Sequence, residues 1–251
     1  MKLTFFGTGD GRQVPAPGCH CRACLRAIEK PQYARLTCSG KITDGLDVSL
    51  IDATMADLNQ RQQAGSFERI FLTHYHANHI RGLAAYKEAE HVTIPVYGPE
   101  DKKDLEDVFE NPGALKFQRP LVPFKTLNFG GLQVTPLPLN HSRPTFGYLF
   151  QQHQGNLAYL SDTCGLPSTT SAMLYGYELD VLVLDCTHPP SHQADQDHNT
   201  LSQALAIHHD IAPKTTYLTH ISHELDCYLL DHLAELPDNV IIARDGMQIT
   251  L

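Results

Sequence analysis

Three histidines fall within six residues of this chain, directly after an apolar segment. His74, His76 and His79 follow residues 70–72, which read Ile-Phe-Leu. Core packing does not require three imidazoles at one strand end. Imidazole is the commonest metal ligand at neutral pH, and several imidazoles that converge on one point suit Zn²⁺, Mn²⁺ or Fe²⁺. The spacing therefore predicts a metal-binding loop at the end of a β-strand.

Three further metal-binding side chains, His141, Asp162 and His220, each follow another predicted strand. Binding and catalytic residues concentrate in the loops at the strand ends of a rigid scaffold. Two divalent ions about 3.5–4 Å apart need several neutral imidazoles and at least one carboxylate that can bridge them. Any one of these histidines alone would more often be a surface residue or a hydrogen-bonded core residue. Their shared position after strands favours a ligand set, so we expect a dinuclear metal site.

A second cluster lies near the N-terminus, where Cys19, Cys21 and Cys24 fall within six residues. Without a recognisable secretion signal, such a cluster more often binds metal than forms disulfides. Three thiolates and one imidazole make a closed tetrahedral zinc site, which is structural because no position stays open to water. We expect His223 as the fourth ligand, because its loop would then serve both sites, and His20 is the weaker alternative. Reduced thiols or a Cys19–Cys24 disulfide are the other interpretations.

Short β-rich segments alternate with helical segments along the chain. The predicted strands, rich in Val, Ile, Leu and aromatic residues, cover residues 3–6, 48–51, 69–72, 94–97, 132–137, 145–150, 156–160, 181–184, 216–218 and 240–243. The predicted helices cover residues 55–63, 80–88, 101–109, 168–175, 200–211 and 228–235, with Ser168 and Thr200 as N-caps. We expect one α/β domain over residues 1–251, with a zinc-bound N-terminal loop at about residues 15–30 and two β-rich halves that meet near residues 130–140.

The composition excludes several classes of partner. The chain has 251 residues, with 19 Lys and Arg against 28 Asp and Glu, which gives a formal net charge of −9. An acidic protein lacks the broad basic surface that binds a nucleic acid polymer or an anionic membrane. Bound metal ions reverse the sign locally, so an anionic small molecule remains compatible. No segment approaches the roughly 20 apolar residues of a membrane span, and we expect a cytoplasmic protein.

The histidine motif resembles the His-x-His-x-Asp-His motif of metallo-β-lactamase-fold hydrolases. The order of His141, Asp162 and His220 also matches that superfamily. The resemblance implies an α/β fold of the αββα type, in which two mixed sheets are flanked by helices. It also implies that one metal is held by His74, His76 and His141, that the other is held by Asn78, His79 and His220, and that Asp162 bridges the two.

The chain departs from the superfamily motif at Asn78, where the family carries an aspartate. An aspartate would bring a negative charge to the second ion and would accept a hydrogen bond from a bridging hydroxide. Asparagine can coordinate through its carbonyl oxygen, but it is neutral and cannot act as a base. Whether the asparagine is natural or introduced, we expect weaker occupancy of the second metal position and slower hydrolysis.

Further segments narrow the resemblance to the PhnP family of cyclic phosphodiesterases, which belongs to the carbon–phosphorus lyase pathway of phosphonate degradation. The matching segments are residues 18–24, 31–33, 38–40, 50–53, 95–99, 133–142, 146–148, 161–163, 165–167, 188–190 and 218–223. The resemblance implies hydrolysis of a small phosphorylated sugar, 5-phosphoribosyl 1,2-cyclic phosphate, to ribose 1,5-bisphosphate, with 2′,3′-cyclic nucleotides as a side reaction. It also implies Mn²⁺ at the active site, with Zn²⁺ as the alternative, one structural Zn²⁺ at the cysteines, and a homodimer.

Other polar residues have predicted roles in catalysis. His198 matches the family position of the general acid that protonates the leaving alkoxide, so we expect His198, Asn78 and Asp162 to take part in the reaction. A well-placed proton donor contributes roughly 10²–10⁴-fold to the rate. Asp52 and Asp185 each follow or end a predicted strand, and we expect them to orient metal-bound imidazoles. Capping of a strand end is the alternative role for both carboxylates.

Two other functions are compatible with this fold. A tRNA 3′-end nuclease shares the chemistry but needs a basic RNA-binding arm, whereas this chain has neither surplus Lys and Arg nor a Gly/Pro/Lys-rich insertion. A non-hydrolytic metal-binding or redox protein, such as the related proteins of pyrroloquinoline quinone biosynthesis, keeps the fold while the hydrolase motif erodes. Only one ligand position is altered here, which favours the hydrolase interpretation.

Overall fold

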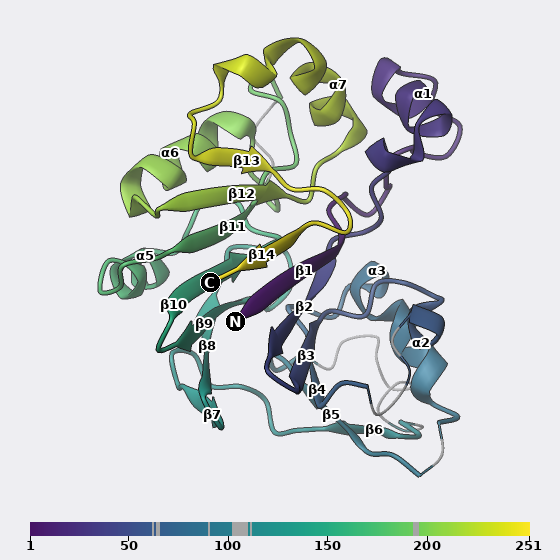
Figure 1. Ribbon diagram of the computed structural model, residues 1–251, viewed down its shortest axis with the longest axis vertical. Helices are drawn as coiled ribbons and strands as arrows, with labels where there is room; N and C mark the ends of the chain where they lie inside the picture. The colour runs from purple at the N-terminus through teal and green to yellow at the C-terminus, as the bar shows by residue number, and fades with distance from the viewer. Residues whose placement is uncertain (62, 64–65, 90, 102–109, 111, 193–195) are drawn as a thin grey trace.

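Two seven-stranded sheets face each other, and helices cover their outer sides (Figure 1). The computed structural model describes residues 1–251 apart from 62, 64–65, 90, 102–109, 111 and 193–195. The first sheet has the strand order β14-β1-β2-β3-β4-β5-β6, and the second has the order β13-β12-β11-β10-β9-β8-β7. Both sheets contain parallel and antiparallel pairs. The predicted αββα sandwich is therefore confirmed.

The strands of the first sheet are β1 (Lys2–Gly7), β2 (Ser39–Asp44), β3 (Asp47–Ile51), β4 (Arg69–Phe71), β5 (Ile94–Tyr97), β6 (Leu115–Phe117) and β14 (Gln248–Thr250). Those of the second are β7 (Leu127–Phe129), β8 (Leu132–Pro138), β9 (Phe146–Gln152), β10 (Gly155–Leu160), β11 (Val181–Asp185), β12 (Thr215–Thr219) and β13 (Val240–Ile242). The α-helices are α1 (Arg22–Glu29), α2 (Leu58–Arg61), α3 (Ala77–Ile80), α5 (Ser168–Leu174), α6 (Leu201–Ile211) and α7 (His223–His232), and the 3₁₀ helices are η1 (Pro31–Tyr33), η2 (Arg81–Tyr86) and η3 (Leu233–Glu235). No helix in the described part of the chain is long and apolar enough to cross a membrane.

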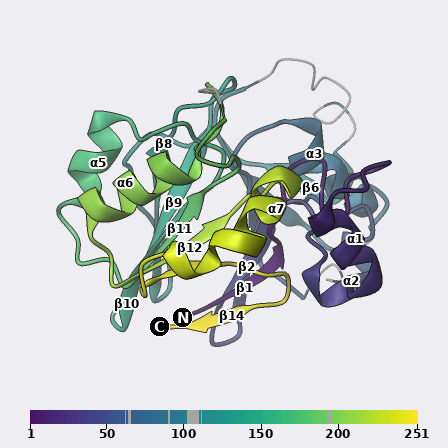
Figure 2. The same cartoon turned by 90° about the horizontal axis from the view of Figure 1, so that it is seen from above.

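The main core lies between the two sheets and is rich in aromatic side chains. Phe71 of β4 lies at its centre, with its ring centroid 5.3 Å from the rings of both Tyr97 and Tyr148 and 5.7 Å from that of Phe129. Because these partners come from β5, β9 and β7, Phe71 connects the two sheets. Two further apolar clusters lie on the outer sides, one under α5, α6 and α7 and the other under α2 and η2 (Figure 2).

Strand direction brings several carboxyl ends to one edge of the sandwich. β3 runs parallel to β4, and β10, β11 and β12 run parallel to one another. β8 has the same direction as β10, because both are antiparallel to β9. The predicted metal ligands extend from the loops that follow these strands.

All ten predicted strands are present, but four further strands were not predicted. β6, β7 and β14 have three residues each, which is too few for an alternating pattern to stand out. β2 contains Gly40, where a Cβ would lie 2.8 Å from the carbonyl oxygen of Thr4 on the neighbouring strand. The two sheets divide between β6 and β7, earlier than the expected 130–140, and β14 returns to the first sheet beside β1.

The helices differ more from the prediction than the strands do. Thr200 caps α6 as predicted, but α5 begins at Ser168 with Pro167 in the cap position, so the predicted cap at Ser168 is wrong. α7 begins five residues before the expected residue 228, because the hydroxyl of Ser222 accepts a hydrogen bond from the Leu225 amide and caps the helix there.

The N-terminal half differs from the helix prediction too. α1 was expected to be part of a loop. The helices predicted over 55–63 and 80–88 shorten to α2 and η2. The helix predicted over 101–109 lies almost wholly outside the described residues.

Candidate metal centre

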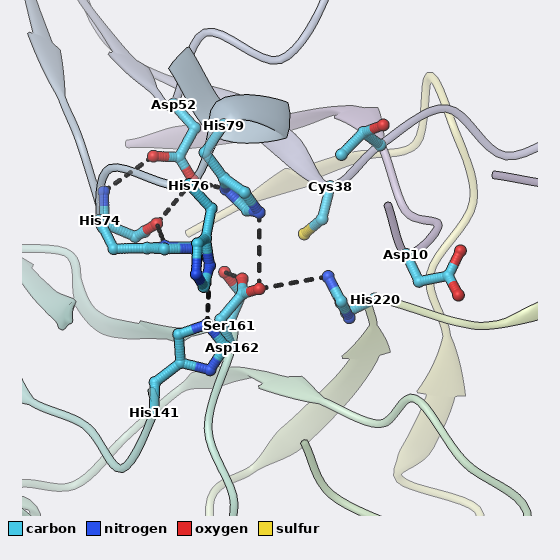
Figure 3. Close-up of polar contacts among 12 residues, drawn as sticks. Asp10, Cys38, Asp52, His74, His76, His79, His141, Ser161, Asp162 and His220 are labelled. Atoms are coloured by element: carbon cyan, nitrogen blue, oxygen red, sulfur yellow. Dashed lines mark hydrogen bonds and ion pairs between the residues drawn. The ribbon is translucent and has the colours of Figure 1, made fainter. Parts of the chain in front are cut away.

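Three imidazoles from two loops converge at the edge of the sandwich (Figure 3). Nε2 of His74 lies 2.9 Å from Nδ1 of His76, and Nε2 of His141 lies 3.1 Å from the same Nδ1. Two ring nitrogens this close require a proton or a cation between them, because their lone pairs repel. The three nitrogens lie within 4.8 Å of one another, which suits a single divalent ion.

A second group of donor atoms surrounds the carboxylate of Asp162. Its Oδ1 lies 3.5 Å from Nε2 of His79 and 3.2 Å from Nε2 of His220. Both nitrogens are buried, and neither has a hydrogen-bond partner among the described residues. A buried polar atom without a partner is costly and calls for a ligand or water. Asp162 also groups with His74, so its carboxylate lies between the two imidazole groups, and the donor set fits a pair of divalent ions.

Asn78 lies beside these donors without adding a charge. It is half-buried in α3 and lines the same cavity as Asp162 and His220. Its amide packs against the N-terminal loop, where a Cβ added to Gly11 would lie 3.3 Å from Nδ2 of Asn78. The predicted departure from the family motif therefore falls at the wall of the candidate site.

Asp52 supports the first loop through two hydrogen bonds to side chains. Its Oδ2 accepts from Nδ1 of His79 at 2.9 Å and from the hydroxyl of Thr73 at 2.9 Å. That hydroxyl lies 2.9 Å from Nδ1 of His74, so Thr73 links the Asp52 carboxylate to a second imidazole through hydrogen bonds. Asp52 also accepts from the backbone amide of Thr73 at 2.8 Å. Asp52 therefore contacts one imidazole directly and a second one through the hydroxyl of Thr73.

Asp185 repeats this arrangement on the second sheet. The hydroxyl of Thr187 donates to its Oδ1 at 3.2 Å and lies 2.8 Å from Nδ1 of His220. Oδ2 of Asp185 accepts from Nδ1 of His198 at 2.9 Å and from the backbone amide of Asp162 at 3.1 Å. When Nδ1 of an imidazole donates in this way, its Nε2 carries the lone pair that can bind a metal.

Burial keeps some of the imidazoles neutral. It lowers the pKa of His74 well below the usual value and also lowers the pKa of His220, so both rings can bind a cation at neutral pH. Burial acts against the charge on His79 as well, but the carboxylates of Asp162 and Asp52 outweigh it and raise the pKa of His79 to about 10. A bound cation would therefore displace a proton from His79.

Three residues at the site adopt a left-handed backbone conformation. Asp52, Asp162 and His220 have φ values of 58°, 61° and 61°. Such a φ costs a residue other than glycine about 1–3 kcal/mol and persists where the surrounding structure holds it. Each of the three lies just after β3, β10 or β12, so the turns that aim these side chains inward carry backbone strain.

A cavity of about 440 Å³ opens over the donor groups. His198 lines it, and its ring stacks on that of His220 with centroids 4.5 Å apart. A donor atom of His198 lies within 4.8 Å of Asp162 and His220, close enough for a ligand role that the sequence did not indicate. Because Nδ1 of His198 bonds to Asp185, Nε2 is the atom that can exchange a proton with a bound molecule.

The cysteine cluster forms between the start of α1 and the start of α7, which lie side by side (Figures 1 and 2). Nδ1 of His223 lies 3.4 Å from Sγ of Cys19 and 3.6 Å from Sγ of Cys21, and Cys24 completes a group within 4.8 Å. All seven cysteines are free, so there is no Cys19–Cys24 disulfide. His20 is exposed and outside the group. Three thiols and one imidazole fit a closed Zn²⁺ site.

Sequence reasoning missed three supporting residues. Thr73 and Thr187 relay the two carboxylates, and the backbone oxygen of Asp197 lies 3.1 Å from Nδ1 of His141. A threonine next to a ligand histidine was the only sign for Thr73. Cys38 is also fully buried, and its Sγ lies 3.2 Å from the hydroxyl oxygen of Tyr159. Burial raises the pKa of Cys38 to about 12, so it is a neutral thiol at neutral pH.

Known proteins resemble this chain over different shares of their length. A crystal structure described as a new diphosphatase from the PhnP family is 29% identical, with 99% of this chain and 96% of that chain covered and a TM-score of 0.83. An octanoyltransferase of Porphyromonas gingivalis is 28% identical over 264 residues, which cover 99% of this chain and 51% of that protein. A ribonuclease Z of Pyrococcus furiosus is 28% identical over 137 residues, which cover 49% of this chain and 45% of that protein.

The chain therefore spans about half the length of the curated relatives it matches. A family profile described as the beta-lactamase superfamily domain matches residues 44–221. That segment contains the histidine motif, His141, Asp162 and His220. The chain belongs to the metallo-β-lactamase superfamily.

Proposed function

We propose that this protein is a metal-dependent phosphodiesterase that hydrolyses a small cyclic phosphate ester. The observation that carries the proposal is the position of Asp162 between two groups of imidazoles at one cavity. The ligands would be His74, His76 and His141 for one ion and Asn78, His79 and His220 for the other, with Asp162 shared. When bound, two divalent ions acidify a water and neutralise the charge of phosphoryl oxygens.

The proposed substrate is 5-phosphoribosyl 1,2-cyclic phosphate, which would be converted to ribose 1,5-bisphosphate in phosphonate degradation. The 29% identity to a PhnP-family structure over almost the full length supports this choice. A cavity of about 440 Å³ is within the usual range for a small ligand. 2′,3′-cyclic nucleotides carry the same strained ester and are proposed as weaker substrates.

His198 would supply the proton that the leaving alkoxide needs. Its Nδ1 is held by Asp185, which keeps the imidazole oriented and stabilises its protonated form. Its ring lies at the cavity, beside His220. A general acid in this position would give up the Nε2 proton as the ester bond breaks.

Metal identity is a further part of the proposal. Imidazole and carboxylate donors accept Mn²⁺ at the active site, and Zn²⁺ remains the alternative there. The thiolates of Cys19, Cys21 and Cys24 would select Zn²⁺ together with His223. A homodimer is also proposed, on the family resemblance alone, and a cytoplasmic location is proposed from the composition of the sequence.

A second candidate reaction is hydrolysis of a diphosphate bond. The PhnP-family structure that resembles this chain is described as a diphosphatase, and the same two-metal chemistry would act on either bond. Processing of tRNA 3′ ends is less favoured despite the ribonuclease Z match, because a net charge of −9 does not suit RNA binding.

A substrate panel tests the proposal. The chain loaded with Mn²⁺ would be incubated with the cyclic ribose phosphate, a 2′,3′-cyclic nucleotide, a diphosphate diester and a tRNA precursor, and the products followed by ³¹P NMR or, for RNA, by gel. We expect the fastest turnover with the cyclic ribose phosphate and none in a His141→Ala control. Fastest turnover of the diphosphate diester or the precursor would replace the proposed substrate, and no hydrolysis of any of them would contradict a hydrolase.

A further inference from the structure

A second, smaller cavity lies between α1, α7 and the segment that follows β13. Its volume is about 40 Å³, and none of the residues at the candidate metal centre lines it. The polar part of its lining is dominated by guanidinium groups. The polar lining residues are Arg26, Gln32, Tyr33, Arg35, Asp226 and Arg244.

The single carboxylate in this lining is already shared by two of the guanidinium groups. Oδ2 of Asp226 lies 3.3 Å from Nη2 of Arg26, and its Oδ1 lies 3.3 Å from Nη2 of Arg35. Arg35 is only 6% exposed and Asp226 only 3%. With Arg244, which is exposed, the lining has three guanidinium groups and one carboxylate.

Two of the arginines that line this cavity each have a guanidinium N–H group without an acceptor. Nε of Arg26 and Nε of Arg35 are buried without a hydrogen-bond partner in the described part of the chain. Nη1 of Arg35, by contrast, donates to the carbonyl oxygen of Ala243 at 2.6 Å and to the hydroxyl of Thr8 at 2.9 Å. Leaving a charged donor unpaired costs more than leaving a neutral one unpaired. The site therefore offers donors, positive charge and space to an acceptor that the protein itself does not supply.

Tyr33 holds two of the guanidinium groups in place. The guanidinium carbon of Arg26 lies 4.2 Å from the centre of the Tyr33 ring, and that of Arg244 lies 5.4 Å from it. A cation over an aromatic face is attracted and oriented by the ring. Arg244 is exposed, so it marks the solvent side of the cavity.

We propose that this cavity is a binding site for a small tetrahedral oxyanion of the phosphate class. Guanidinium groups bind such anions through paired, planar N–H donors, which ammonium groups cannot do. One ordered water needs roughly 10–15 Å³ of such volume, so about 40 Å³ corresponds to the space of about three waters, enough for a single oxyanion and too small for a nucleotide. The anion would bind to the guanidinium groups that line the cavity and add negative charge beside them.

Isothermal titration of the full, metal-loaded chain with inorganic phosphate tests the site. The variant would be Arg244→Gln, alone and combined with Arg26→Gln, and the control would be Arg22→Gln. Arg22 lies on the same helix as Arg26, but it is exposed, is paired with Asp231 at 2.7 Å and does not line the cavity. Sulfate would serve as a second tetrahedral anion, and acetate and chloride at equal ionic strength would separate tetrahedral anions from other ones.

We expect saturable binding of phosphate and sulfate that weakens at least about tenfold in the double variant and stays unchanged in Arg22→Gln. Phosphate bound at the metal centre would persist in all variants and so is distinguished. Equal phosphate affinity in the parent and in folded Arg244→Gln and double variants would overturn the proposal. So would an equal response to acetate or chloride. Zinc content and thermal unfolding would establish folding, and Arg244→Gln alone decides if Arg26→Gln fails to fold.

Discussion

At the scale of single residues, two threonine hydroxyl groups hold imidazoles of the candidate metal centre in place. Thr73 and Thr187 each connect one imidazole to a buried carboxylate. These hydrogen bonds fix which ring nitrogen carries the proton, and the other nitrogen is then available for a cation. The two hydrogen-bond chains lie on different sheets, yet in each of them a histidine contacts a threonine and the threonine contacts an aspartate.

Replacement of Thr187 by valine removes one relay and keeps the side-chain shape. We expect Thr187→Val to bind active-site metal about 10–100-fold more weakly, because Nδ1 of His220 loses its acceptor. Competition with a chelator would measure this affinity. The control is Thr135→Val, a fully buried threonine whose hydroxyl bonds to Thr126 away from the site. Equal metal affinity in both variants would show that the relay does not tune the metal.

Removal of His198 tests the proton donor. We expect His198→Asn to lower kcat for the cyclic ester by about 10²–10⁴-fold, while the proposed ligand set of Asp162 and five imidazoles still retains metal. Steady-state kinetics and metal analysis of the same preparation would separate the two effects. His192→Asn, at an exposed residue of the same loop region, is the control. Loss of metal together with activity would instead indicate that His198 is a ligand.

At the scale of elements, the cysteine cluster ties α1 to the first turn of α7. Its thiols must lose protons before they bind Zn²⁺. Burial raises the pKa of Cys24 to about 12, whereas a hydrogen bond from the Cys21 backbone lowers the pKa of Cys19. At neutral pH the metal-free protein therefore holds a proton on Cys24 that zinc must displace.

Zinc affinity should consequently fall as the pH falls. Protons compete with zinc when the pH is below the pKa of a thiol. For Cys24 this holds across the whole neutral range, because the pKa of its thiol is about 12. We expect a loss of up to about tenfold per pH unit for each thiol that zinc deprotonates. Competition with a coloured chelator between about pH 8 and pH 6 measures this, and a flat profile would contradict thiolate ligation.

Some elements could be predicted from the sequence and others could not. β11 begins with four consecutive apolar residues and was found, and the histidine motif is visible because its histidines lie close in sequence. α1 was missed because two arginines and one cysteine interrupt its apolar pattern. The contact of Asp197 with His141 joins residues 56 apart, and that of Thr187 with His220 joins residues 33 apart. Such contacts follow from the tertiary fold and leave no local pattern.

At the scale of the whole molecule, the two sheets hold the halves of the site in register. The candidate ligands on the first sheet face those on the second, so metal binding would require the sandwich to be intact. Phe71 packs against rings from both sheets and is fully buried. Removing this ring would leave a cavity at the contact that joins the sheets.

We expect Phe71→Ala to lower the free energy of unfolding by about 3–5 kcal/mol, the usual cost of deleting a buried aromatic ring. Leu46→Ala is the control, because Leu46 is 99% exposed and should change stability by less than about 0.5 kcal/mol. Urea unfolding of the metal-loaded proteins would give both values. A small effect of Phe71→Ala would show that the sheets do not depend on this aromatic contact.

We propose that this protein hydrolyses a cyclic phosphate ester and that the neutral side chain of Asn78 weakens its metal centre. Turnover of 5-phosphoribosyl 1,2-cyclic phosphate with added Mn²⁺, measured side by side for the parent chain and Asn78→Asp, tests it most directly. We predict faster turnover in the variant, because a carboxylate adds charge at the second group of donors and can accept a proton. Comparable turnover in both proteins would show that the missing charge at position 78 does not slow hydrolysis. No turnover in either protein, with metals bound, would contradict hydrolase function.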